Sequence, residues 1–150
     1  MRVIRSMMLS AVLLVLTGCA ATGPLYKDVA ASIPPVPAGK GRIFFYRSDT
    51  IFGAAMTSDI RLNDKVVGRS ERGSFFYVDT MPGNYAVATS TEVERRLTFT
   101  LATGKTRYVK TTVSMGALVG RINPELVNAD VGKSDIQELH YTGGTALSGK

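Results

Sequence analysis

Short runs of strand-forming residues, each closed by turn residues, limit most strongly how this chain folds. Between Gly41 and Val113 the runs are rich in aromatic and β-branched residues, which favour strands. Asn, Asp, Gly and Pro separate the runs, and these residues favour tight turns. Seven to eight short strands at this spacing predict an all-β fold, an antiparallel sandwich with an open barrel as the alternative.

The first two strand regions are clear in the sequence. Ile43 to Tyr46 are strong strand formers and predict a central strand, whereas the glycine- and alanine-rich segment 50–59 predicts a loop. Ile60 and Leu62 alternate with polar residues before Asn63-Asp64-Lys65. Val66 and Val67 follow, so this region predicts a tight hairpin.

Two more strand pairs repeat this pattern. The run 75–78 precedes Pro82-Gly83, which favours a type II turn into a strand at 85–89. In the second pair Leu97, Phe99 and Leu101 alternate with threonines, as expected for a half-buried antiparallel strand. Thr103-Gly104-Lys105 then turns the chain into a strand at 108–113.

The C-terminal part changes character. Segment 124–130 predicts a final strand, and residues 131–141 predict a short helix capped by Ser134, with Gln137 three residues later and Ile136 and Leu139 at helical spacing. The expected organisation is therefore a sandwich domain over 41–140, followed by a flexible tail over 141–150.

The N-terminal segment reads as an export signal. Arg2 and Arg5 form a basic start, and the apolar run that follows is too short to span a bilayer but suits a secretory signal. Leu16-Thr17-Gly18-Cys19 resembles the lipobox of bacterial lipoproteins. The resemblance implies cleavage after residue 18 and a lipid on Cys19. The alternatives are an ordinary signal with a coincidental cysteine, or a structural thiol.

A lipid on Cys19 implies a compartment and a partner. Ala20, instead of an aspartate, resembles the outer-membrane sorting pattern, so we expect anchoring on the periplasmic side of the outer membrane; the inner membrane and the cell surface are alternatives. Removing residues 1–18 lowers the formal charge from +6 to +4. The expected partners are the membrane and an envelope protein or glycan, with no nucleic acid. Residues 19–40 contain four prolines and predict an extended tether with a helical turn around Tyr26 to Ser32.

The residue types that usually carry catalysis are sparse. His140 is the sole histidine, and its place near the C-terminus favours a surface or helix-end role. Glu92 and Glu94 share one face of a strand but are expected to be turn-edge charges. The glycine-rich segments lack the features of a nucleotide-binding loop. We therefore expect no metal, no cofactor and no catalytic residue.

The most suggestive cluster is aromatic and basic. Successive strand residues point to opposite faces, so if Phe44 and Tyr46 face inward, Phe45 and Arg47 face outward. Together with Phe76 they would form an exposed aromatic ledge, defined here as Phe45, Arg47 and Phe76, which could stack a sugar ring or bind a peptide. The alternative is that both faces are covered, one by the second sheet and one by the Pro-rich segment or the C-terminal helix.

Residues 42–88 also resemble a known group of small bacterial lipoproteins, the domain-of-unknown-function family 2846. The resemblance lies in the aromatic strand that ends in Tyr46-Arg47, the turn from Asn63 to Gly68, the aromatic strand 75–77 and Pro82-Gly83. Such hairpins are also similar to PEGA-type sandwich repeats. The likeness extends over about residues 40–139 and implies a β-sandwich lipoprotein.

The function expected from these observations is a membrane-anchored, non-catalytic binding or structural module of the cell envelope. One alternative is a glycan-acting enzyme, which needs two carboxylic acids facing each other across a cleft. The other is an edge-strand adaptor, in which an exposed sheet edge pairs with a strand of another envelope protein.

Overall fold

The structure is a computed structural model that describes residues 21–143. Leader residues 1–18, Cys19 and the end of the predicted tail lie outside the described residues. Nine strands and three short helical elements follow one another in the order α1 (Tyr26–Val29), η1 (Ala30–Ser32), β1 (Gly41–Arg47), β2 (Ser58–Leu62), β3 (Lys65–Ser70), β4 (Ser74–Thr80), β5 (Gly83–Ser90), β6 (Glu94–Leu101), β7 (Thr106–Ser114), β8 (Arg121–Val127), α2 (Ala129–Asp135) and β9 (His140–Tyr141).

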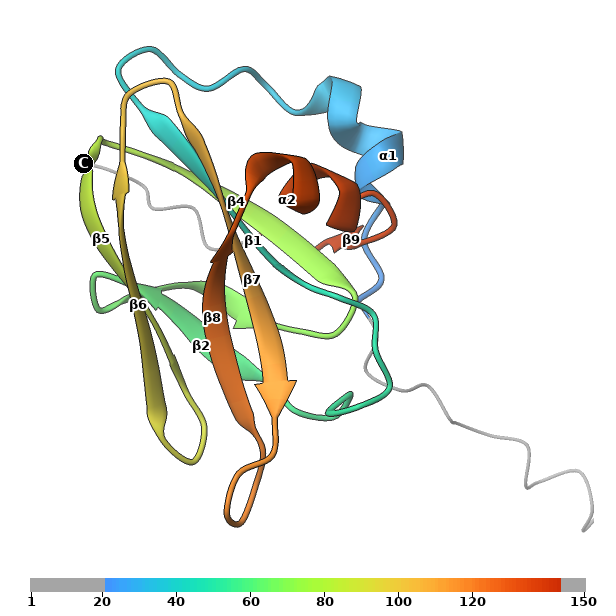
Figure 1. The fold of residues 1–150 in the computed structure, drawn as a ribbon. Coiled ribbons are helices and arrows are strands. Elements are labelled where there is room, and N and C mark those ends of the chain that lie inside the picture. The colour runs from blue at the N-terminus through green and yellow to red at the C-terminus, as the bar shows by residue number, and fades with distance from the viewer. Residues whose placement is uncertain (1–20, 144–150) are drawn as a thin grey trace, which may run out of the picture.

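The strands form two sheets, as Figure 1 shows. The five-stranded sheet has the order β8-β7-β1-β4-β9, and the four-stranded sheet has the order β3-β2-β5-β6. The predicted all-β sandwich is therefore confirmed, and β1 is the central strand of its sheet. Most pairs are antiparallel, but β1 pairs with β7 and β4 pairs with β9 in parallel.

The hairpin predicted between Leu62 and Lys65 is confirmed. Asn63 and Asp64 have φ angles of 47° and 67°. Positive φ at both central residues is the geometry of a type I′ turn, whose twist matches that of the two flanking strands. Asn63 also accepts a hydrogen bond from the backbone N–H of Ala86 through Oδ1 at 2.8 Å, which ties the turn to β5.

The other two predicted strand pairs are not hairpins. β4 and β5 lie in different sheets, and so do β6 and β7, so the segments around Pro82-Gly83 and Gly104 carry the chain across the sandwich. Gly83 has a φ of 157°, far from the value of about 80° in a type II turn. Turn residues specify a change of direction, but they do not specify the neighbour with which the next strand pairs.

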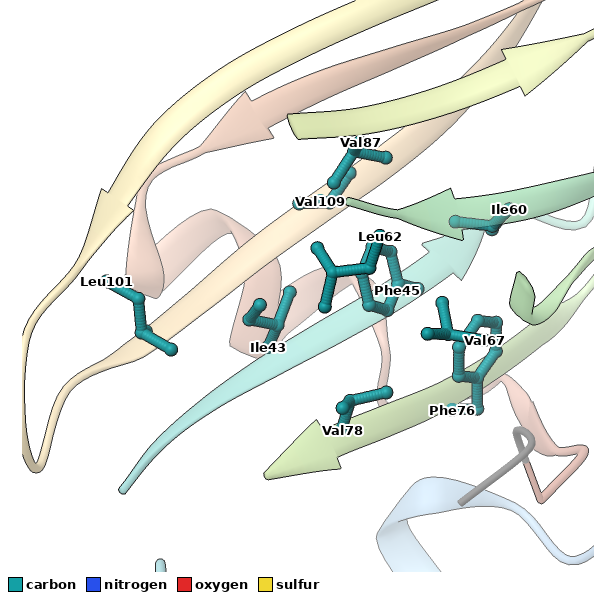
Figure 2. Close-up of a cluster of buried hydrophobic side chains, with 10 residues drawn as sticks. All are labelled: Ile43, Phe45, Ile60, Leu62, Val67, Phe76, Val78, Val87, Leu101 and Val109. Atoms are coloured by element: carbon teal, nitrogen blue, oxygen red, sulfur yellow. The ribbon is translucent and has the colours of Figure 1, made fainter. Parts of the chain in front are cut away.

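The main core lies between the two sheets, and Figure 2 shows its ten buried side chains. Alternate residues of each strand point into it, as the strand period of two requires. Gly68 lets β3 approach this core closely, because a Cβ on Gly68 would lie 2.4 Å from Cζ of Phe76. The core is formed by Ile43, Phe45, Ile60, Leu62, Val67, Phe76, Val78, Val87, Leu101 and Val109.

A second apolar layer covers the other face of the five-stranded sheet. Figure 1 shows α1 and α2 on this side, away from the four-stranded sheet. With both faces covered, every residue of β1 is buried, which explains its unbroken apolar run. The buried residues of this layer are Phe44, Tyr46, Phe75, Tyr108, Ile136 and Leu139, with Tyr26, Val29 and Ile33 packed against them.

The segment predicted as a tether is largely part of this layer. The expected helical turn is present as α1 and η1. The backbone N–H of Tyr26 donates to the carbonyl of Leu139 at 2.9 Å, and Leu25 forms a β-bridge with His140. The predicted domain boundary at residue 40 is thus wrong for Leu25 to Ile33, because their apolar side chains have a sheet face to cover.

The C-terminal helix is present but begins earlier than predicted. α2 starts after Asn128 and ends at Asp135, so Ser134 lies in its last turn and is not a cap. Ile136 and Leu139 are buried beyond the helix end, and His140 and Tyr141 add a short strand next to β4. Gly132 lets α2 approach the sheet, because a Cβ there would overlap the ring of Tyr108.

Candidate functional site

The predicted aromatic ledge is not a surface. Phe45 and Phe76 are 0% and 1% exposed, and their rings stack between the sheets with centroids 5.1 Å apart. Arg47 is 2% exposed. The expectation of an exposed ligand-binding ledge at Phe45, Arg47 and Phe76 is therefore wrong, because the second sheet covers this face.

The alternative, with both faces covered, is the arrangement that the structure shows. Tyr26 packs edge-on against Phe75 and Phe44, with centroids 5.3 and 6.1 Å away. Phe44 stacks on Tyr108 at 5.1 Å. The aromatic residues of β1 and β4 thus form two internal layers, and the surface that remains for binding lies elsewhere.

Arg47 has a structural role that leads to this surface. Its guanidinium donates hydrogen bonds to the carbonyl oxygens of Met56 and Gly53. Both acceptors belong to the connection 48–57 between β1 and β2. Burial, and to a smaller extent the charge of Arg72, lowers the pKa of Arg47. A buried cation at the end of β1 thereby fixes the course of this long connection.

Three connections converge at this end of the sandwich, and we call them together the loop end: residues 48–57, 91–93 and 115–120. They occupy the lower part of Figure 1. Gly53 packs on β7, since a Cβ there would lie 2.6 Å from Cγ1 of Val113, and Gly120 is packed equally closely against Met56. The connections 48–57 and 115–120 therefore support each other.

Glu92 joins the third connection to the others. Its carboxylate accepts hydrogen bonds from the backbone N–H groups of Ala117, Leu118 and Val119, at 3.2, 3.4 and 3.4 Å. Glu94 contacts Arg96 at 3.1 Å instead. The two carboxylates predicted as turn-edge charges thus have separate structural partners.

The loop end exposes a concentrated set of large apolar side chains. Leu118 is 91% exposed and Ile51 is 86% exposed. The sequence predicted a loop over 50–59 and no binding site in these segments. The signal that could have revealed a site was present, because 50–57 and 115–120 are apolar connections without a single ionisable residue. The exposed set is Ile51, Phe52, Val93, Met115, Leu118 and Val119.

The polar clusters away from the loop end stabilise the fold. Arg42 binds the Asp79 carboxylate with two hydrogen bonds of 2.6 and 2.7 Å and donates a third to the carbonyl of Pro34. Its guanidinium also lies 4.3 Å from the ring centroid of Tyr77. The hydrogen bond to Asp79 raises the pKa of Arg42 against the effect of burial. This cluster fixes the segment that leads from η1 into β1.

A second polar cluster joins α2 to the sheet. The Asp135 carboxylate accepts hydrogen bonds from Lys110 and from the Tyr46 hydroxyl, both at 2.9 Å. Burial alone would raise the pKa of Asp135, but these two hydrogen bonds outweigh it and lower the pKa. Burial, followed by the hydrogen bond to Asp135, raises the pKa of Tyr46. The cluster favours a charged Asp135 and a neutral Tyr46.

His140 is neither at a helix end nor free on the surface. It lies in β9, and its Nδ1 is 2.5 Å from the carbonyl oxygen of Gly23. A small apolar cavity of about 200 Å³ lies nearby, between η1 and the sheet. Within residues 21–143 no group of three metal-ligating side chains comes together, and no helix is long and apolar enough to cross a bilayer. The cavity is lined by Val29, Ser32, Ile33, Tyr77 and Tyr141.

Comparison with known proteins confirms the predicted family resemblance. A protein of Haemophilus influenzae described as "Uncharacterized protein" is 29% identical over 103 residues, which are 68% of this chain and 61% of that protein. The chain thus matches less than two thirds of that relative's length. No solved structure matches the chain significantly. The family described as "Protein of unknown function (DUF2846)" matches residues 37–122, and the chain belongs to this family.

Proposed function

We propose that this chain is a lipid-anchored protein of the bacterial envelope whose β-sandwich acts by binding and not by catalysis. The observation that carries the proposal is the lipobox-like Leu16-Thr17-Gly18-Cys19, which ends two residues before Ala21, the first residue that the structure describes. Two or more acyl chains on one residue hold a protein on a membrane with very slow release. The outer membrane, on its periplasmic side, is the proposed location.

The packing of the N-terminal segment supports a location close to the membrane. A free spacer over residues 19–40 would let the domain move far from its anchor. Instead, Tyr26, Val29 and Ile33 pack on the five-stranded sheet, and the amide of Tyr141 donates to the carbonyl of Pro24 at 2.8 Å. An anchor on Cys19 would therefore hold the sandwich at the bilayer surface.

The environment of the buried ionisable groups supports a binding or structural role. Arg42 is paired with Asp79, Asp135 is bound by Lys110 and Tyr46, and Arg47 is bound to loop carbonyls. A catalytic acid or base needs access to a substrate. These groups are instead used to join α2, the N-terminal segment and the connection 48–57 to the sheets.

Cell fractionation of a Cys19→Ser variant tests the proposal. The unsubstituted protein is expected in the membrane fraction, resistant to high salt and carbonate washes. The variant is expected to lose most of this membrane association, because the serine oxygen does not take the lipid. Ala20→Ser is the matched control and should remain in the membrane. Equal membrane association of Cys19→Ser would contradict lipid anchoring.

A second candidate function is strand addition at β6. This strand pairs with β5, and its second half, Leu97 to Leu101, carries no charged residue. Edge strands without charges are open to pairing with another chain. An open groove of about 450 Å³ lies over the face of the β5–β6 pair and is lined in part by Asn84, Thr98 and Thr100. The edge strand β8 is protected by Pro124, which cannot donate a ladder hydrogen bond.

A photocrosslinking residue at Thr98 tests this second candidate in intact cells. Strand addition predicts one discrete crosslinked product at Thr98 that is lost when Thr100 is replaced by proline. The same crosslinker at exposed Asp130 in α2 is the control. Identical products from both positions would rule out a specific contact at β6.

A further inference from the structure

We infer that the loop end is a membrane-docking surface that lies in the interface of the lipid leaflet holding the anchor. The inference rests on the proposed lipid on Cys19 and adds a defined orientation of the domain on the bilayer. The loop end would contact the region of the leaflet between the lipid headgroups and the acyl chains. The contact residues are Ile51, Phe52, Met115, Leu118 and Val119.

The distribution of exposed apolar side chains supports this docking surface. Scattered exposed apolar residues are normal in proteins, whereas an exposed contiguous patch marks an interaction site. The contact residues come from two connections that touch each other through Gly53 on Val113 and Gly120 on Met56. Neither 50–57 nor 115–120 contains a charged side chain, and the Glu92 carboxylate beside them accepts hydrogen bonds from three backbone amides.

Backbone groups of these connections already have hydrogen-bond partners within the protein. Polar backbone groups enter a lipid environment only when they are hydrogen-bonded internally. The carbonyls of Gly53 and Met56 accept from Arg47, and the amides of 117–119 donate to Glu92. The amides of Ala54 and Met56 donate within their own loop. Partners of this kind suit a docking surface at a lipid interface.

The position at which the N-terminal segment joins the sandwich also supports this docking surface. The carbonyl of Gly23 contacts His140, whose amide donates to the carbonyl of Gly73 at 2.8 Å. Gly73 in turn packs on Asp49, which begins the connection to Ile51. The chain therefore enters the described region near the start of the connection 48–57.

The proposed lipid anchor is the reason to assign the membrane as the binding partner of the loop end. Cys19 precedes Ala21 by two residues, and a chain advances at most about 3.5 Å per residue. A lipid on Cys19 would thus keep this end of the sandwich at the bilayer, with its apolar side chains facing the same leaflet. Amphipathic surfaces of this kind bind about 5–10 Å deep in the interfacial region.

A pair of labelled variants tests the inference. Leu118→Cys, at the loop end, and Met81→Cys, at the opposite end, both replace exposed apolar residues. Each full-length protein is processed in cells, labelled with an environment-sensitive fluorophore and placed in vesicles of phosphatidylethanolamine and phosphatidylglycerol. Spin-labelled lipids should quench the Leu118 label several-fold more than the Met81 label, and iodide in the water should quench the Met81 label more.

The outcomes separate this inference from the proposed function. The unsubstituted protein is the labelling blank, and label on its Cys19 would show that the thiol is free and that the anchor itself is absent. Membrane-bound protein whose two labels are quenched equally by lipid would overturn the docking surface alone. A Leu118 label shielded from both quenchers would place a protein there, a partner or a second copy, and would also overturn it.

Discussion

The Nη1 atom of Arg47 donates a hydrogen bond of 2.6 Å to the carbonyl oxygen of Met56, which lies nine residues later in the chain. This contact joins the end of the central strand to the connection that carries Ile51 and Phe52. An arginine that the sequence suggested as a ligand contact is therefore a support for the loop end.

Replacing Arg47 by methionine should destabilise the protein without changing its fold class. The substitution keeps an apolar stem but removes the Arg47 donor from the Met56 carbonyl and one of the two donors from the Gly53 carbonyl, at a cost of about 1–3 kcal/mol. Urea denaturation measures the free energy of unfolding, and hydrogen exchange should show faster exchange in 48–57. A loss below about 0.5 kcal/mol would show that the guanidinium does not support this connection.

Alanine substitutions of Phe45 and Phe52 should differ in their effect on the free energy of unfolding, because Phe45 is buried and Phe52 is exposed. Phe45→Ala should lower the free energy of unfolding by about 3–5 kcal/mol, since it leaves a cavity beside Phe76. Phe52→Ala should change it by no more than about 0.5 kcal/mol. Thermal or urea unfolding of both variants checks the pair. A Phe45→Ala protein as stable as the unsubstituted one would mean that this ring is on the surface.

Tyr26 tests whether the N-terminal segment belongs to the folded domain. Its ring packs edge-on against Phe44 and Phe75, so Tyr26→Ala should lower the free energy of unfolding by about 1–3 kcal/mol. Replacing Lys40, which lies after the packed segment, by alanine is the control and should have little effect. Equal stability of both variants would indicate that residues 25–33 do not pack on the sheet and act as a free tether.

Asp135 should make stability depend on pH in the acid range. Its folded-state pKa is lowered, so its contribution is present above the unfolded-state value near 4 and is lost as pH falls through the folded-state pKa. Asp135→Asn should therefore cost about 1–2 kcal/mol at pH 7 and much less near pH 2. Urea denaturation at both pH values measures this. The exposed Asp130→Asn, in the same helix, is the control, and an Asp135→Asn cost that does not change with pH would contradict the assignment.

Local chemistry made part of the fold predictable. The unbroken apolar run of β1 predicted a central strand because residues with strand propensity on both faces require cover on both faces. Asn63-Asp64 predicted the β2–β3 turn because these residues adopt positive φ with little cost. The sandwich itself followed from the number and spacing of such segments.

The remaining features depend on long-range packing that local patterns do not encode. The sequence around Pro82-Gly83 does not tell whether the next strand pairs with β4 or crosses to the other sheet. Strand alternation separates Phe44 from Phe45, but it does not say which elements cover each face. The role of Tyr26 depends on a sheet face formed by residues far along the chain, and the loop end depends on three connections that only the fold brings together.

The mass of the mature protein purified from membranes tests the central claim most directly. The account predicts a chain that begins at Cys19, lacks residues 1–18 and carries a diacylglycerol-type adduct on the N-terminal peptide. A mature protein whose Cys19 is an unmodified thiol, or one that retains residues 1–18, would contradict the anchor and with it the proposed position of the sandwich on the membrane.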